Sequence, residues 1–377
     1  MKSSAILSVR GTRNYGIDLL RIVSMFMVVL LHTLGQGGIL KSTVPLTAQY
    51  EISWFLEIAA LCAVNCYALI SGYVGYGSKF KYTNIVIIWL QVVIYNFIIT
   101  LIYSFILPNV TSKRLCGAIF PVTNRAYWYF TAYFCLYFLT PIINTAIKHL
   151  TENRLKAISL SIILIFTVIP LFAKADLFFT NDGYSAFWLV ILYFLGGVIK
   201  KCRILENIRI RWLLLMYLGV ILITWLHKLW ADCHNMFSPN EPKMKQIFVE
   251  YTSPTILFAA IFLLVAFSKL KINKNKSTAK FIKRVSPLSF GVYLIHVQYY
   301  VWRQLFENAF SYYAEFNAVA LIFSVLGTVI EIYTVCSVID FLREKLFGLL
   351  KIKKGLNRLE AKFLPNLWKD EGKTMSN

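Results

Sequence analysis

Charged residues are scarce in this chain of 377 residues. Asp, Glu, Lys and Arg make up 15% of it, whereas they make up about 25% of a typical soluble domain. Hydrophobic residues account for 58%, and the mean hydropathy is +0.62. This balance excludes an ordinary soluble globular protein and predicts a polytopic membrane protein.

Acidic residues are scarcer still. There are 18 of them against 39 lysines and arginines, which gives a formal net charge of +21. Such a charge can indicate a nucleic-acid partner, but here the basic residues cluster between apolar runs and form no domain interleaved with aromatic residues. The seven cysteines show no spacing typical of a zinc site or a disulfide framework. We therefore expect neither nucleic-acid binding nor a metal.

Long apolar runs dominate the rest of the chain. A helix that spans a bilayer needs about 20 mostly apolar residues. The first run follows basic residues, as in a signal peptide, but it has no A-x-A-like cleavage site, so we expect it to be retained. The sequence predicts an all-α bundle of about ten membrane helices, at 17–35, 52–76, 84–108, 127–147, 157–173, 184–199, 211–230, 251–268, 287–308 and 316–341.

The distribution of basic residues sets the expected orientation. With the N-terminus inside, most of the 39 lysines and arginines fall in inner segments, as cytoplasmic loops require. We expect both termini in the cytoplasm and the protein in a bacterial plasma (inner) membrane. Residues 1–341 would form the membrane domain. Residues 342–377 read as a basic amphipathic tail that lies along the inner surface.

Ionisable residues inside membrane helices are costly, so they usually face the bundle interior and mark a pathway or site. The position of each ionisable residue along its expected helix gives its depth in the membrane. His32 and Glu57 lie at similar depth near the outer side, on consecutive antiparallel helices. The full set is Asp18, Arg21, His32, Glu57, His296, Arg303, Glu331 and Asp340.

Arg21 and His32 share one face of the first expected helix. Eleven residues at about 100° each complete three turns, which places them about 16 Å apart along the axis. Histidine is the usual general base near neutral pH, and arginine suits phosphate or carboxylate oxygens. A long acyl-coenzyme A donor would fit this stripe, but so would the substrate path of a proton-coupled transporter. The spacing alone leaves both open.

Four stretches resemble the acyltransferase family 3 membrane proteins. That family carries an arginine, ten residues and then a histidine in its first membrane helix, and Arg21 and His32 match this pattern. The family also has an SGY segment, an aromatic middle helix ending in Pro-x-x-Asn, and a late S-x-G-x-Y-L-x-H segment. The matching stretches are RNYGIDLLRIVSMFMVVLLHT (13–33), NCYALISGYVGY (65–76), WYFTAYFCLYFLTPIIN (128–144) and SPLSFGVYLIHVQYY (286–300).

The resemblance implies an O-acyltransferase similar to those that modify bacterial surface polysaccharides. Such an enzyme moves an acyl group, usually acetyl, from cytoplasmic acetyl-CoA to a sugar hydroxyl of a lipid-linked or surface glycan. It implies His32 as general base or, as a second option, transient acyl carrier, and Arg21 as a donor contact. We expect acetyl-CoA as donor substrate and no cofactor. Relatives often have proline where this chain has Val297, which leaves the shape near His296 open.

Four further residues are expected near the site. His296, Ser71 and Tyr73 are expected to bind substrate, and Ser71–Gly72–Tyr73 to permit close helix approach. No G-x-S-x-G elbow surrounds Ser71, which argues against a nucleophile. Glu57 is expected to orient His32 on depth alone.

Three functions remain under consideration at this stage. The first is acyl transfer, alone or with a separate partner, because no hydrolase-like domain is evident in the sequence. The second is a transporter or flippase of lipid-linked saccharides that uses the same stripe. The third is a structural partner in a surface-glycan assembly complex.

Overall fold

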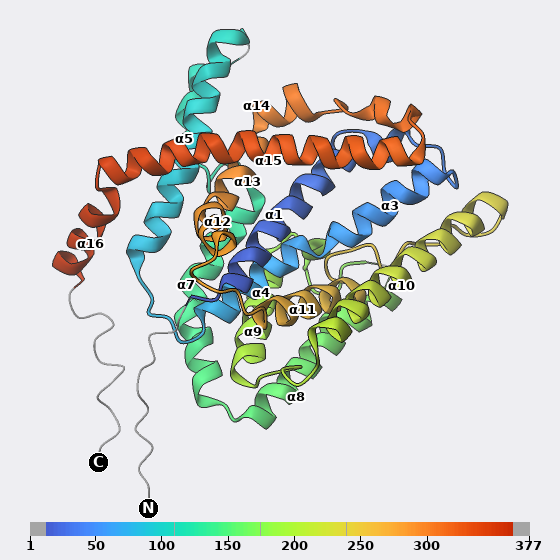
Figure 1. Ribbon diagram of the computed structural model, residues 1–377, viewed down its shortest axis with the longest axis horizontal. Helices are drawn as coiled ribbons and strands as arrows, with labels where there is room; N and C mark the ends of the chain where they lie inside the picture. Colours follow the sequence, from blue (N-terminus) through green and yellow to red (C-terminus); the bar gives the residue numbers. More distant parts are fainter. Residues whose placement is uncertain (1–12, 109, 174, 239, 365–377) are drawn as a thin grey trace, which may run out of the picture.

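The computed structural model describes residues 13–108, 110–173, 175–238 and 240–364. Every regular element in these ranges is a helix, which confirms the expected all-α class (Figure 1). Within them, seven helical segments are long and apolar enough to cross a membrane. They are α1 (Tyr15–Leu34) with α2 (Ile39–Ser42), α3 (Ala48–Leu61) with α4 (Ala63–Gly75), α5 (Tyr82–Ile106), α7 (Trp128–His149), α8 (Glu152–Ile163) with η1 (Leu164–Val168) and η2 (Ile169–Phe172), α10 (Ile210–Phe237) and α15 (Ala318–Leu349).

The other three expected membrane helices differ from a simple span. Two are short, α9 (Ala186–Lys201) and α11 (Pro254–Ser268), and most of their side chains are buried among other helices. The run 287–308 is not one helix. It breaks into η4 (Ser286–Leu288), α13 (Ser289–His296), α14 (Tyr299–Val301) and η5 (Trp302–Phe306).

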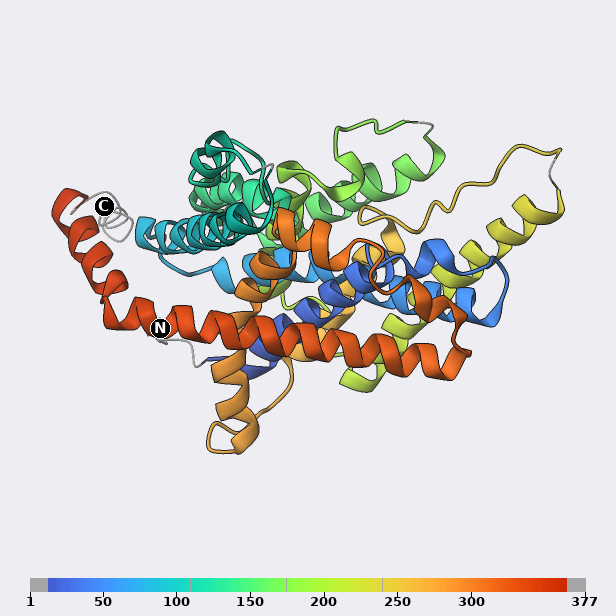
Figure 2. The same cartoon turned by 90° about the horizontal axis from the view of Figure 1, so that it is seen from above.

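Helix α1 lies in the middle of the bundle. It begins behind Asn14, whose side chain accepts hydrogen bonds from the Gly16 and Ile17 N–H groups. It packs against α3, α4, α11, α13 and α15 (Figures 1 and 2). This central position buries Asp18 and leaves Arg21 and His32 only partly exposed.

Glycines allow α4 and α9 to pack closely. A Cβ added at Gly72 would stand 1.9 Å from the Tyr193 carbonyl oxygen, and one at Gly196 would stand 2.1 Å from the Leu69 carbonyl oxygen. The close helix approach expected at Ser71–Gly72–Tyr73 is therefore present. It joins the inner half of α4 to the helix that begins at Ala186.

Short helices complete the chain: α6 (Ser112–Ala118), η3 (Asn181–Gly183), α12 (Ser277–Val285), η6 (Ser311–Glu315) and α16 (Ile352–Phe363). Helix α15 continues past residue 341, where the tail was expected to begin, and ends at Leu349. Helix α16 then packs beside the start of α5, where Glu360 accepts hydrogen bonds from the Tyr82 and Thr83 N–H groups. Residues 365–377 of the expected tail lie outside the described residues.

Candidate active site

Two histidines from opposite ends of the chain meet inside the bundle. His32 lies in the last turn of α1, and His296 is the last residue of α13. The His32 Nδ1 atom is 2.8 Å from the His296 Nε2 atom, although the two residues are 264 positions apart. His296 is only 1% exposed. We call His32 and His296 the histidine pair.

Hydrogen bonding determines which ring nitrogens carry protons. The His296 Nδ1 atom lies 2.6 Å from the Val292 carbonyl oxygen, which can only accept, so Nδ1 carries a hydrogen and donates. In the neutral ring, His296 Nε2 must then accept the hydrogen bond from His32 Nδ1–H. This leaves the lone pair of His32 Nε2 without a hydrogen-bond donor among the described residues. In this tautomer Nε2 is the atom that can accept a proton.

A break in the chain positions His296. Helix α13 ends at His296, and its C-cap residue is Val297 instead of a proline. Gln298 begins the next turn by accepting hydrogen bonds from the Tyr300 and Val301 N–H groups. The Gln298 side chain also donates to the Thr100 hydroxyl of α5 at 3.2 Å. The shape near His296, left open by the sequence, is therefore a break that side-chain capping forms without a proline.

Aromatic rings enclose the histidine pair. Trp302 meets His32 edge-on, with ring centroids 4.7 Å apart, and Phe306 lies 5.6 Å from His296. Both rings come from η5, the helix that follows the break. They limit the access of water to the pair.

Glu57, expected to orient His32, is not the residue that is hydrogen-bonded to it. No hydrogen bond or ion pair joins it to His32 among the described residues, and its Oε2 atom is buried without a hydrogen-bond partner there. The His32 ring nitrogen is hydrogen-bonded to His296 instead. The orienting contact comes from α13 and not from α3.

Arg21 lies at the opposite end of the α1 stripe. Its Nη1 atom donates to the buried Asp18 carboxylate at 2.6 Å, and Arg13 also pairs with Asp18. The Arg21 carbonyl accepts a hydrogen bond from the Tyr67 hydroxyl at 2.7 Å. The guanidinium is therefore held in place but remains partly exposed.

A row of tyrosines connects the inner side with the histidine pair. Tyr129, Tyr133 and Tyr137 follow one another at helical spacing on α7, with centroid separations of 6.4 and 6.3 Å. Tyr293 continues the row, 6.3 Å from Tyr129 and 6.4 Å from His296. We call Tyr129, Tyr133, Tyr137 and Tyr293 the tyrosine row. It gives the bundle interior an amphipathic lining.

A cationic pocket of about 700 Å³ opens at the inner end of α1. It is lined by the first residues of α1, by Tyr73 of α4 and by residues near the ends of α9 and α11. The Lys200 Nζ atom lies 5.7 Å from the centre of the Tyr73 ring. The charged lining residues are Arg13, Lys200, Arg203, Lys269, Lys271 and Glu206.

The Ser71 hydroxyl is hydrogen-bonded within its own helix. Its hydroxyl donates to the Tyr67 carbonyl, one turn earlier in α4, at 2.9 Å. No acid or base is hydrogen-bonded to it among the described residues. This contact gives no support to a nucleophilic serine.

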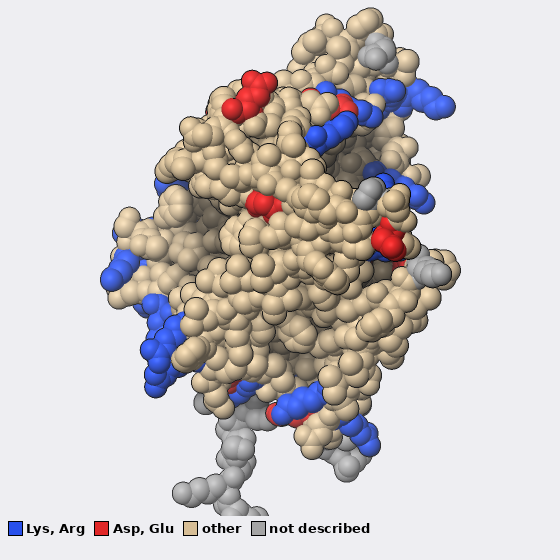
Figure 3. Space-filling model, turned by 90° about the vertical axis from the view of Figure 1, so that its right-hand side faces the viewer, with Lys and Arg blue, Asp and Glu red and all other residues tan. Residues whose placement is uncertain are grey.

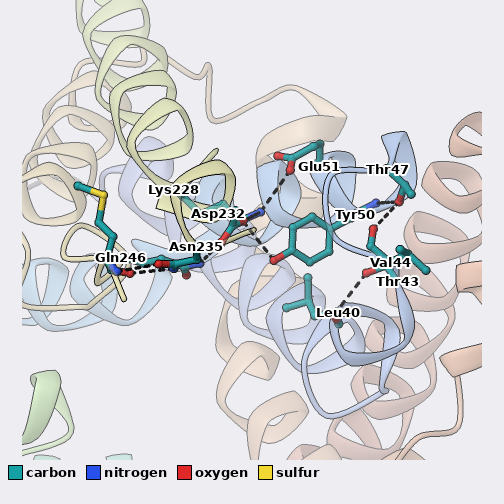
Figure 4. A network of polar contacts seen from close by, with 11 residues as sticks. Leu40, Thr43, Val44, Thr47, Tyr50, Glu51, Lys228, Asp232, Asn235 and Gln246 are labelled. Carbon is teal, nitrogen blue, oxygen red and sulfur yellow. Dashed lines mark hydrogen bonds and ion pairs between the residues drawn. The ribbon is translucent and has the colours of Figure 1, made fainter. Parts of the chain in front are cut away.

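Sequence analysis did not single out Lys228, which is fully buried in α10. Its Nζ atom lies 2.7 Å from Asp232 Oδ2 and 3.6 Å from Glu51 Oε1, and 3.8 Å from the centre of the Tyr50 ring (Figure 4). The one feature of the sequence that could have indicated this ion pair is the spacing of four residues between Lys228 and Asp232, at the end of an apolar run. The cluster fastens the far half of α10 to α3. Figure 3 shows that end of the molecule, where Lys and Arg lie around the margin of the face.

The histidine pair, Arg21 and the tyrosine row fall within one family match. A family model described as an acyltransferase domain matches residues 14–336. Searches of the curated proteins and of the solved structures return no match. Within the described residues, no group of three His, Cys, Asp or Glu side chains is placed to hold a metal ion.

Proposed function

Because this chain belongs to the acyltransferase family whose domain covers residues 14–336, we propose a specific membrane reaction for it. It transfers an acetyl group from cytoplasmic acetyl-CoA to a sugar hydroxyl of a lipid-linked or cell-surface polysaccharide. The observation that carries the proposal is the histidine pair, in which His296 leaves the Nε2 lone pair of His32 free.

In this reaction His32 is the general base. Its Nε2 atom takes the proton of the acceptor hydroxyl as the hydroxyl oxygen attacks the thioester carbon. His296 accepts the hydrogen bond from His32 Nδ1–H throughout, which orients the ring and disperses its positive charge. When the carbon–sulfur bond breaks, His32 returns the proton to the CoA thiolate.

The cationic pocket supplies a place for the anionic part of the donor. Its five basic side chains suit phosphate oxygens, and its volume falls in the range of small-molecule sites, about 300–1,000 Å³. From there, Arg21 and the tyrosine row would guide the pantetheine arm toward the histidine pair. The expected donor contact of Arg21 and substrate contact of Tyr73 belong to this route.

The proposal retains the expected setting. The protein lies in a bacterial plasma membrane with both termini in the cytoplasm, and acts alone or with proteins of surface-glycan assembly. A transporter or flippase of lipid-linked saccharides would use the same interior. A proton-coupled transporter could also use an imidazole base, so it is the family match that favours transfer.

The test uses purified protein in liposomes with radiolabelled acetyl-CoA and extracted bacterial glycolipids. Wild type is compared with His32→Ala and His32→Gln, and CoA binding is measured in each preparation. We expect label transfer in wild type and at least a 1,000-fold loss in both variants, as on removal of a catalytic base, with CoA binding intact. Absence of both CoA binding and label transfer in wild type would contradict the proposal and favour saccharide transport.

A further inference from the structure

Tyr293 carries a buried hydroxyl that has no hydrogen-bond partner in the described part of the chain. The residue is only 6% exposed. Buried polar groups are nearly always hydrogen-bonded, so an exception in a folded protein calls for a functional explanation. The histidine mechanism above makes no use of this group.

The position of Tyr293 relates it to the reaction. It precedes His296 by one turn of α13, and its ring meets the His296 ring edge-on at 6.4 Å. On its other side it meets Tyr129 at 6.3 Å. Tyr293 is therefore the member of the tyrosine row that stands next to the histidine pair.

The start of α7 faces the same place. Its first residue is Trp128, and the preceding Tyr127 holds this end against α13 by donating its hydroxyl to the Leu294 carbonyl at 3.0 Å. In the described part of the chain, no side chain accepts a hydrogen bond from the first N–H groups of α7. The Tyr293 ring meets the ring of Tyr129, which lies in this first turn, at a centroid distance of 6.3 Å.

The first turn of α7 offers backbone N–H groups that can donate hydrogen bonds. The N–H groups of a first helical turn have no acceptor within the helix, and the helix dipole places partial positive charge there. Helix α7 has 22 residues, long enough for the effect. The start of α7 and the Tyr293 phenol thus both lie at α13 within one turn of His296.

We propose that the Tyr293 hydroxyl and the first-turn N–H groups of α7 bind the carbonyl oxygen of the acyl group during transfer. This inference rests on the proposed function and adds a site to it.

The site acts on the charge that develops in the reaction. The acceptor oxygen bonds to the thioester carbon while its proton passes to His32 Nε2, and the carbonyl electron pair moves onto oxygen. That oxyanion receives hydrogen bonds from the Tyr293 O–H and the α7 N–H groups. The electron pair then returns, the carbon–sulfur bond breaks, and the thiolate leaves with the proton from His32.

The test compares wild type with Tyr293→Phe in the liposome assay. Phenylalanine keeps the ring between His296 and Tyr129 and removes only the hydroxyl. We expect kcat for acetyl transfer to fall about 100-fold, the effect of losing one oxyanion donor. The KM for acetyl-CoA and the affinity for CoA should stay within about 2-fold of wild type, since neither ground-state ligand uses this contact.

Tyr217→Phe is the matched control, because it removes the hydroxyl of a tyrosine on α10 that has a structural partner, the Ala59 carbonyl at 2.8 Å, and that takes no part in the proposed site. It should lower the melting temperature and keep kcat within about 3-fold of wild type. A Tyr293→Phe enzyme with wild-type kcat would overturn the inference alone. So would a fall in kcat matched by equal losses of CoA affinity and melting temperature. A wild type that does not turn over acetyl-CoA would overturn the proposed function and the inference with it.

Discussion

At the scale of single residues, the account depends on the direction of two hydrogen bonds. The Val292 carbonyl sets the protonated nitrogen of His296, and His296 in turn sets that of His32. In the proposed mechanism His296 is therefore a positioning residue that acts through His32, in place of the direct substrate contact expected from the sequence. Experiments can separate this positioning role from a purely structural role of the buried His296 side chain.

His296→Ala removes the acceptor of the His32 Nδ1–H bond and frees the ring to adopt the other tautomer. We expect kcat to fall by about 100-fold or more, by analogy with loss of the orienting group in a catalytic triad, with little change in the KM for acetyl-CoA. His296→Gln, whose amide oxygen can accept the same bond, should recover part of the rate. The pH–rate profile of each variant is the second readout.

A structural role alone would give a different pattern. In that case both substitutions would lower the melting temperature, and the pH–rate profile of the remaining activity would match that of wild type. Equal kcat in His296→Ala and wild type would show that His32 needs no orienting partner.

At the scale of helices, two contacts hold the bundle around the site. One is the glycine contact between α4 and α9, and the other is the buried ionic cluster between α3 and α10. Neither contact includes a residue of the histidine pair. We therefore predict that substitutions in them change the stability of the protein.

Gly72→Ala places a methyl group against the Tyr193 carbonyl. Because backbone cannot move aside cheaply, we expect a loss of about 1–3 kcal/mol in the free energy of unfolding, seen as a lower melting temperature in detergent. Gly219→Ala in α10 is the control, since a Cβ there meets nothing within 4 Å. It should leave stability unchanged or raise it by up to about 1 kcal/mol. Equal melting temperatures for the two variants would refute the close contact.

Lys228→Met leaves the carboxylates of Glu51 and Asp232 without their cation. Removing one partner of a buried ion pair costs about 3–5 kcal/mol, so the melting temperature should fall sharply. Lys156→Met breaks the exposed pair with Glu152 and should cost less than about 1 kcal/mol. A Lys228→Met protein as stable as the Lys156→Met control would mean that the cluster does not fasten α10 to α3.

At the scale of the whole molecule, the all-α class and most helix positions follow from the length of the apolar runs. The prediction of one membrane helix at 287–308 was wrong, because the length of an apolar run does not reveal a break within it. The local sign of the break is Gln298, which caps the new turn. Lateral packing is also invisible in a single sequence. Similar depth in the membrane predicted Glu57 of the next helix as the partner of His32. In the folded chain the hydrogen-bond partner of His32 is His296, 264 residues away.

The same limit explains the other residues that were missed. Lys228 stands near the end of an apolar run, where a basic residue is ordinarily taken for an interface charge. Its burial depends on α3 packing over it. Tyr293 is one of 22 tyrosines in the chain, and only its unpartnered hydroxyl beside the start of α7 distinguishes it.

The central claim is that the bundle moves an acetyl group from CoA with His32 as base. Its most direct test measures free CoA thiol and acetylated glycolipid together, in liposomes containing wild type or His32→Gln. We expect one thiol released for each acetyl group transferred by wild type, and neither product from His32→Gln although CoA still binds. Equal rates of acetyl transfer by the two proteins would contradict the account.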